Sequence, residues 1–307
     1  MKKEVIKLYE KFLKDNNLTL GTDSAREFCD LYENDYDIEL LSDEYVQYAQ
    51  NLKDKNSRFN GYKNAYLISI DNIVAKILMY ENKRDKRNDM INVNDIPFTP
   101  YKNKVYYLDF LKDEVNLEYG ELLTNNLYNP NIDMDIMNAG YKGRAYIWVL
   151  RTLYFAYISE FDFENAIKTG EKIIAINKND YFDILLSLPY LYINTDQIDN
   201  AISLLKRKNE NTTDMILLKS ITAFFKNNDE LSIKNLKELD NKNSSLMKFI
   251  VTTYRPSNLR KLIENDDSYQ EASLIYAGYI LMGDDKIDMF RDFVIKHMDE
   301  IDKFCIE

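Results

Sequence analysis

The sequence predicts an all-α protein, and three observations carry this prediction. Apolar residues recur along most of the chain at the i, i+3, i+4, i+7 spacing that places them on one face of a helix. Glycine and proline are scarce, at eight and five among 307 residues, which argues against turn-rich β architectures. No stretch alternates apolar and polar residues for long enough to predict a strand. Because 45% of the residues are hydrophobic, a sizeable buried core is expected rather than disorder.

Residues 1–91 are predicted to form an acidic helical region of about four helices. Ser24 and Glu27 show the S-x-x-E spacing of a capping box, in which the hydroxyl and the carboxylate satisfy free backbone amides at a helix start. Ser42 is expected to cap a third helix. A longer apolar series over residues 66–78 predicts one continuous helix there.

Residues 92–104 interrupt the helical pattern and are predicted to be a linker. They contain Pro97 and Pro100, and proline disfavours helical conformation in the residue before it. Periodicity then resumes, so residues 105–307 are predicted to form a second helical region.

The helical segments of that second region come in similar pairs. Ala166 and Ala201 are 35 residues apart, and Tyr157 and Tyr192 each precede one of them by nine residues. A period near 34 residues, with a small residue that lets two helices approach closely, is typical of tetratricopeptide repeats (TPR). Two more degenerate pairs are predicted at residues 216–236 and 274–294.

The segment from about residue 107 to residue 250 resembles bacterial TPR proteins related to the suppressor-of-tumorigenicity family. The residues that carry the resemblance occur in order along the chain: Gly143-Arg144-Ala145-Tyr146, the pair around Ala166, the turn Asn177-Lys178-Asn179-Asp180, and Leu188-Pro189 before Asn200-Ala201. Ala145 replaces the proline of the family pattern. The resemblance implies a right-handed α-solenoid of TPR-like helical hairpins that acts as an interaction module, and it supplies no catalytic residue.

Charge and motifs exclude several classes of protein. The net charge of −11 argues against nucleic acid as a partner, although a local basic patch is compatible with that average. Nucleotide-binding glycine motifs are missing, and a single histidine excludes multi-histidine metal sites. We therefore expect no cofactor and no metal. A polar N-terminus without an apolar signal segment, no membrane-length apolar run, and only two cysteines, Cys29 and Cys305, predict a cytoplasmic protein without a membrane partner.

Two surfaces are candidates for holding a protein or peptide partner. Aromatic residues are dense in the first two helix pairs, and tyrosine dominates binding hot spots because it buries a large area and keeps a polar tip. Residues expected to line a groove there are Tyr146, Arg151, Tyr154, Tyr190 and Asn194. The alternative surface is the carboxylate-rich segment of residues 23–44, which would attract a basic partner.

The leading hypothesis is a TPR-like scaffold that binds a protein or peptide and does no chemistry, with its oligomeric state left open. One alternative is a helical ribonuclease, because Arg291 and His297 resemble the arginine–spacer–histidine signature of HEPN-type enzymes. Six residues apart on a helix, however, they fall on different faces. A second alternative is a receptor whose N-terminal bundle moves when a peptide fills the groove. Asp71, Glu81 and Lys83 have the bare spacing of a nuclease D…E-x-K site, but that site normally lies on strands.

Overall fold

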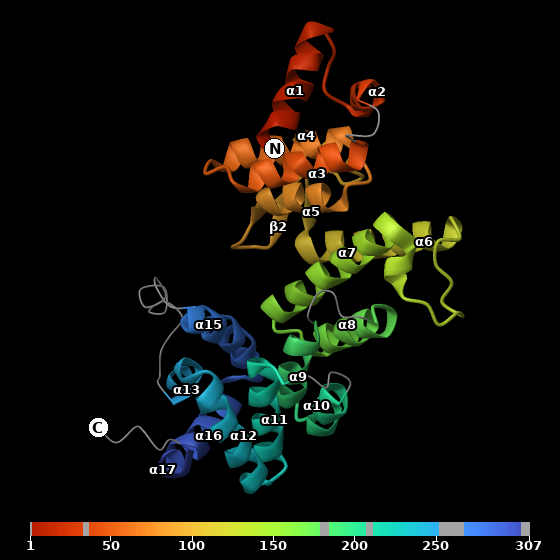
Figure 1. Cartoon of the computed structure of the whole chain (residues 1–307). Coiled ribbons are helices and arrows are strands. Elements are labelled where there is room, and N and C mark those ends of the chain that lie inside the picture. The colour runs from red at the N-terminus through yellow and green to blue at the C-terminus, as the bar shows by residue number, and fades with distance from the viewer. Residues whose placement is uncertain (1, 33–36, 179–183, 207–210, 252–266, 302–307) are drawn as a thin grey trace. The chain divides into compact units, whose positions relative to one another are not determined.

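The computed structural model describes residues 2–32, 37–178, 184–206, 211–251 and 267–301. Helices dominate this part of the chain, which confirms the all-α prediction. The chain forms two compact units, residues 1–156 and residues 157–307, drawn from red to blue in Figure 1. These units differ from the predicted domains, because the proline-containing segment lies inside the first unit.

The first unit begins with a bundle in which α3 packs on α4 and α4 packs on α5 (Figure 1). Its helices are α1 (Lys2–Asp15), α2 (Thr22–Leu31), α3 (Ile38–Gln50), α4 (Lys55–Ile68) and α5 (Ile73–Asn82). The predicted continuous helix over residues 66–78 is wrong, because the chain breaks between α4 and α5. Asn72 causes this break: its buried side chain accepts a hydrogen bond from the backbone amide of Ala75 and so begins a new helix.

The two predicted serine caps are also wrong. Ser24 lies inside α2, where its buried hydroxyl is 2.9 Å from the Tyr9 hydroxyl. Ser42 lies inside α3 and donates to the carbonyl of Ala65. Asp37 caps α3 instead, since its carboxylate accepts from the backbone amide of Leu40. Both serines therefore tie helices together rather than starting them.

A small antiparallel sheet follows α5, although the sequence predicts no strand. Strands β1 (Arg84–Asp85), β2 (Met90–Asn92) and β3 (Lys104–Tyr106) lie in the order β1-β2-β3, with Ile91 opposite Val105. The predicted linker connects β2 to β3, and it buries Val93 and Ile96 in the first unit. Strands of two and three residues are too short to show alternation, so periodicity could not reveal them.

The first unit continues through α6 (Tyr107–Thr124), the 3₁₀ turn η1 (Ile136–Ala139) and residues 140–156 of α7 (Gly140–Ser159). Gly143 allows α7 to pass η1 very closely, because a β-carbon there would lie 2.0 Å from the carbonyl oxygen of Ile136. Phe110 of α6 stacks on Tyr80 of α5 at 4.0 Å between ring centroids. This contact anchors α6 to the bundle.

The second unit consists of helices that pack mainly on their sequence neighbours, as in α9 with α10 and α11 with α12. The helices are α8 (Phe163–Ile176), α9 (Ile184–Asn194), α10 (Ile198–Leu205), α11 (Thr213–Phe225), α12 (Asp229–Lys242), α13 (Ser244–Val251), α15 (Asp267–Tyr279), η2 (Ile280–Met282), α16 (Asp284–Lys296) and α17 (Met298–Ile301). Helices thus occupy the predicted pairs around Ala166 and Ala201 and at residues 216–236 and 274–294.

One set of contacts in the second unit joins segments far apart in the sequence. Helix α15 and η2 pack against α9. The amide of Asn194 donates to the carbonyl of Leu281 at 2.8 Å, and the rings of Tyr190 and Tyr279 meet edge to face at 6.5 Å. In an open solenoid each repeat contacts only its neighbours, so these contacts are a departure from that simple plan.

Buried tyrosines are a main component of both cores. Tyr9, Tyr45 and Tyr80 of the first unit and Tyr190 and Tyr279 of the second are at most 2% exposed. Burial disfavours the phenolate, so it raises the pKa of Tyr80 and of Tyr66 to about 12 and holds that of Tyr190 well above its ordinary value. These side chains therefore behave as large hydrophobic groups at neutral pH.

Two further expectations from the sequence concern membrane-spanning segments and the two cysteines. None of the helices described is both long enough and apolar enough to span a bilayer. Cys29 is a half-buried free thiol, whereas Cys305 lies outside the described residues.

Candidate functional site

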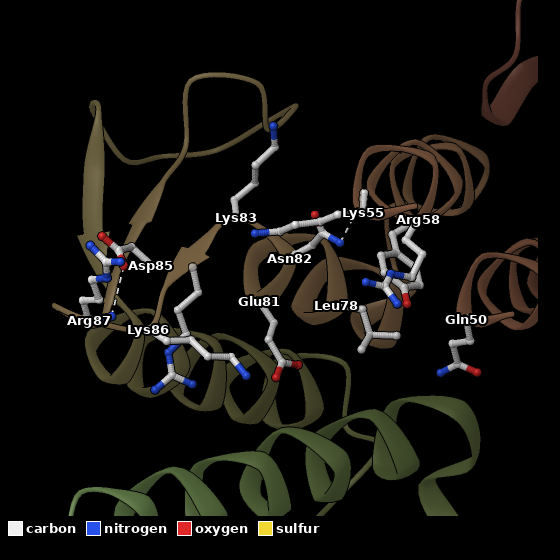
Figure 2. Close-up of a pocket in the computed structure, with 12 residues that line it drawn as sticks. Gln50, Lys55, Arg58, Leu78, Glu81, Asn82, Lys83, Asp85, Lys86 and Arg87 are labelled. Atoms are coloured by element: carbon white, nitrogen blue, oxygen red, sulfur yellow. Dashed lines mark hydrogen bonds between the residues drawn. The ribbon is translucent and has the colours of Figure 1, made fainter. Parts of the chain in front are cut away.

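The first unit contains a cavity of about 760 Å³ with a strongly basic lining. Gln50 of α3, the first two turns of α4, the end of α5 and the chain through β1 form its walls (Figure 2). Six cationic side chains line it, against the two acidic side chains Glu81 and Asp85; the cations are Lys55, Arg58, Lys83, Arg84, Lys86 and Arg87. This excess of positive charge contrasts with the net charge of −11 for the whole chain.

Local structure explains how these cations come together. Four of the five residues from Lys83 to Arg87 are basic, and they directly follow the C-terminus of α5, where the helix dipole favours positive charge. The side-chain amide of Asn82 donates to the carbonyl of Lys55 at 3.2 Å, which joins the end of α5 to the start of α4. Figure 2 shows Lys55 and Arg58 on one side of Glu81 and Lys86 and Arg87 on the other.

Two of the six cations are held by the protein itself. The Lys83 ammonium lies 3.0 Å from an Asp95 carboxylate oxygen and 4.1 Å from the centre of the Phe59 ring. Arg84 pairs with Asp89 and lies over the Tyr107 ring at 4.1 Å. Lys83 and Arg84 therefore have structural partners within the first unit.

The other four cationic side chains of the cavity differ from Lys83 and Arg84 in their ion pairing. Within the described residues, Lys55, Arg58, Lys86 and Arg87 make no ion pair within 4.0 Å. Like charges gathered without partners repel one another. A bound anion would relieve that repulsion, so this half of the cavity can accept negative charge.

A second cavity, of about 430 Å³, lies in the second unit between α10, α11 and α12. Its lining includes the apolar residues Ile202, Leu205, Ala223 and Leu231 and the lysines Lys206, Lys219 and Lys226. Lys226 is paired with Asp199 at 2.6 Å. A lining that combines apolar side chains with lysines suits a ligand that has an apolar side chain next to an acidic one.

The structure corrects the predicted groove residues in α7. Tyr146 and Tyr154 are both 0% exposed. The ring of Tyr146 stacks on Tyr119 at 5.4 Å, and that of Tyr154 meets Phe155 edge to face at 5.0 Å. Arg151 is half-buried, with its guanidinium 5.0 Å from the centre of the Phe155 ring. Tyrosines that bury their whole surface cannot line an open groove, so packing explains them.

The predicted groove residues of α9 are covered by the C-terminal helices. Tyr190 is 2% exposed. Its ring packs closely against Gly278, since a β-carbon added to Gly278 would lie 3.1 Å from the Tyr190 ring. Asn194 is half-buried and bonded to η2 through Leu281. Both residues therefore contact other helices of the second unit.

Arg291 and His297, the residues of the ribonuclease alternative, each have a separate carboxylate partner. Arg291 pairs with Asp288 at 2.9 Å, and the Nδ1 atom of His297 lies 3.0 Å from Glu300. The His297 ring packs on Phe293 at 4.8 Å. Arg291 lies within α16 and His297 just after its end, roughly 9 Å apart along the axis. The two residues form no shared site here.

The nuclease-like spacing of Asp71, Glu81 and Lys83 also does not become a site. Asp71 precedes α5 and Glu81 lies near its end, so a helical rise of about 1.5 Å per residue separates them by roughly 15 Å. Asp71 is bonded to Lys142 at 2.9 Å instead. Glu81 and Lys83 do both line the basic cavity.

The face of α6 that carries Glu114, Glu118 and Glu121 holds buried charge. Glu114 is 3% exposed and bonds the Lys76 ammonium at 2.8 Å. Glu118 is 5% exposed, and its Oε2 atom has no hydrogen-bond partner in the described structure. Burial raises the pKa of Glu118 to about 7, although nearby Lys142 opposes this.

Of the acidic face predicted at residues 23–44, Asp23, Glu27 and Asp30 are exposed, and Glu33 and Asp35 lie outside the described residues. Asp43 is turned inward and accepts from the Asn72 amide at 2.9 Å. Among the described residues, no group of three or more His, Cys, Asp or Glu side chains is arranged to hold a metal ion.

The basic cavity is the feature that sequence reasoning missed. Its signal was present in the run Lys83–Arg87 and in Lys55 and Arg58, but the average charge of the chain concealed it. Comparison with known proteins adds no further guide: no family model matches the chain, and no curated protein matches it either.

Proposed function

We propose that this chain is a TPR-like binding protein that holds a peptide segment of a protein partner in its second unit. The observation that carries the proposal is the cavity between α10, α11 and α12, which both apolar residues and lysines line. A peptide that places a leucine or phenylalanine next to a glutamate would match both features.

The helical framework supports this function. In the proposal, α9–α10 and α11–α12 are successive TPR-like hairpins of a right-handed solenoid, and α15 and η2 close the array by packing on α9. Ser220 and Ser232 bond each other's carbonyl at 3.0 Å and lock α11 to α12. A cavity between helices fixed in this way is already formed, so a peptide would lose little affinity to ordering of the protein.

The test is a library of octapeptides, each with one leucine or phenylalanine flanked by glutamates, measured by fluorescence polarisation. We expect selected peptides to bind, and we expect Leu231→Asp and Lys206→Glu each to weaken binding at least tenfold, about 1.4 kcal/mol. Leu231→Asp removes an apolar wall, and Lys206→Glu reverses a charge that would pair with glutamate. Both side chains are exposed, so the variants should fold.

Lys234→Glu is the matched control. It changes the charge by the same amount on an exposed position of α12 that does not line the cavity. Binding by Lys234→Glu should equal that of the unchanged protein. If no library peptide binds, or if the two cavity variants bind as tightly as this control, the proposal is wrong.

A further inference from the structure

We infer that the basic cavity of the first unit binds a compact ligand with two or more phosphate groups, of the size of a nucleotide. The inference rests on the cavity itself and not on the peptide proposal, which concerns the other unit. Lys55, Arg58, Lys86 and Arg87 line the cavity and make no ion pair with any other residue that the structure describes. They lie on α4 and just after β1, so they approach the same space from two sides.

The local charge balance remains positive after the nearby carboxylates are counted. Glu81 and Asp85 line the cavity, and one Asp85 oxygen accepts from the backbone amide of Arg87. Asp54 caps the start of α4, where its carboxylate accepts a hydrogen bond from the backbone amide of Ser57. This hydrogen bond is the chief cause that lowers the pKa of the Asp54 carboxyl, and Arg58 contributes less. An anion with more than one charge is therefore needed to neutralise the four cations.

Phosphate chemistry suits these side chains better than carboxylate chemistry. Arg58 and Arg87 present planar guanidinium forks, which match the oxygens of a phosphate. A phosphate group also carries more charge in a small volume than the single negative charge of an Asp or Glu side chain. Two or three linked phosphates would reach the cations on both sides of Glu81, whereas an acidic peptide spreads its charge along an extended chain.

The cavity also has room and surface for the rest of such a ligand. Its volume of about 760 Å³ falls in the range of roughly 300–1,000 Å³ that small-molecule sites occupy. Tyr62 and Leu78 provide apolar wall, and Gln50 and Asn82 provide amides. Mixed apolar and amide surface beside a cationic cluster fits a base or sugar attached to phosphates.

A long nucleic-acid strand is a poorer match. Its backbone would continue past the cavity and meet carboxylates close by, among them Asp54 and the 70%-exposed Asp95. Repulsion between charges within a Debye length of roughly 8–10 Å is only partly screened at physiological salt. A compact ligand keeps all of its phosphates among the cations.

The experiment is isothermal titration of the full chain with four probes at constant ionic strength: ATP, inorganic tripolyphosphate, a hexa-aspartate peptide and a twelve-nucleotide single-stranded RNA. We expect ATP, tripolyphosphate or both to bind in the micromolar range and to raise the melting temperature. Preference for ATP would identify a nucleotide, and preference for tripolyphosphate a free polyphosphate. Absence of binding by both, or tighter binding of the peptide or the RNA, would overturn the inference.

Substitutions locate the binding. Arg58→Gln and Arg87→Gln should each weaken it at least tenfold, and Glu81→Gln should tighten it about threefold because it removes a repelling carboxylate. Lys63→Gln, on α4 but outside the cavity lining, should change nothing. A structural role for the arginines would lower the melting temperature without ligand, whereas removing unpaired like charges should leave it unchanged or higher. Equal affinity of Arg58→Gln, Arg87→Gln and Lys63→Gln would contradict the site.

Discussion

Replacing Glu118 by glutamine should stabilise the first unit by about 3 kcal/mol at pH 8 and by much less at pH 5. Glu118 is 5% exposed, and burial raises the pKa of its carboxyl from 4.5 to about 7. The folded chain therefore binds this proton more tightly than the unfolded chain does. Stability is lost as the pH rises from about 4.5 to 7 and stays low above that. Glutamine has the shape of the protonated acid and cannot ionise.

The measurement is urea denaturation at both pH values, followed by the fluorescence of Trp148, the chain's single tryptophan, which lies in the first unit. Glu121→Gln serves as the control on the same face of α6. Its side chain is 37% exposed and pairs with Lys142, so its loss should cost at most about 1 kcal/mol, with no gain at pH 8. An equal effect of Glu118→Gln at pH 5 and pH 8 would show that this carboxyl is not the source of the pH dependence.

Gly143→Ala should destabilise the first unit by about 3 kcal/mol. The added β-carbon would lie 2.0 Å from the carbonyl oxygen of Ile136. Because that neighbour is backbone rather than a flexible side chain, α7 and η1 must separate to admit the methyl group. The same urea experiment measures the loss, and circular dichroism should show that the helices are retained.

Gly120→Ala is the contrasting substitution. Gly120 lies in α6 with nothing within 4 Å of where a β-carbon would be, so alanine should stabilise the helix by roughly 0.5–1 kcal/mol. The two glycines are both helical, yet the expected signs are opposite. If Gly143→Ala is also stabilising, the close approach of α7 to η1 is not present in solution.

The all-α class could be predicted because helical periodicity is a local property that every segment displays independently. The positions of the helix pairs could be predicted for the same reason, as at residues 274–294, where α15 and α16 lie. Helix starts were less predictable. Ser24 and Ser42 have side chains that can cap a helix, but in the structure their hydroxyl groups form hydrogen bonds between helices. Their role depends on partners distant in the sequence.

The candidate sites were the least predictable part. Tyr190 and Asn194 were expected to line a groove, but α15 and η2 pack onto α9, and Asn194 is bonded to Leu281 of η2. The basic cavity needs Lys55 and Arg58 to meet the Lys83–Arg87 run, which depends on how α4 packs on α5. Composition gives only the sum of the charges over the chain and does not show where basic side chains gather.

The buried tyrosines give the molecule an internal optical reporter of its own unfolding. In alkaline solution, exposed tyrosines lose their protons near their ordinary pKa of 10, and their ultraviolet absorption moves to longer wavelength. In the folded chain, Tyr66 and Tyr80, with pKa values of about 12, and Tyr190, whose pKa burial also raises, stay neutral at pH values at which exposed tyrosines lose their protons. Because unfolding releases their protons, stability falls as the pH rises above 10. A spectrophotometric titration would therefore divide the 24 tyrosines into a surface class and a core class. The change in ultraviolet absorption of the core class would report the unfolding of each core.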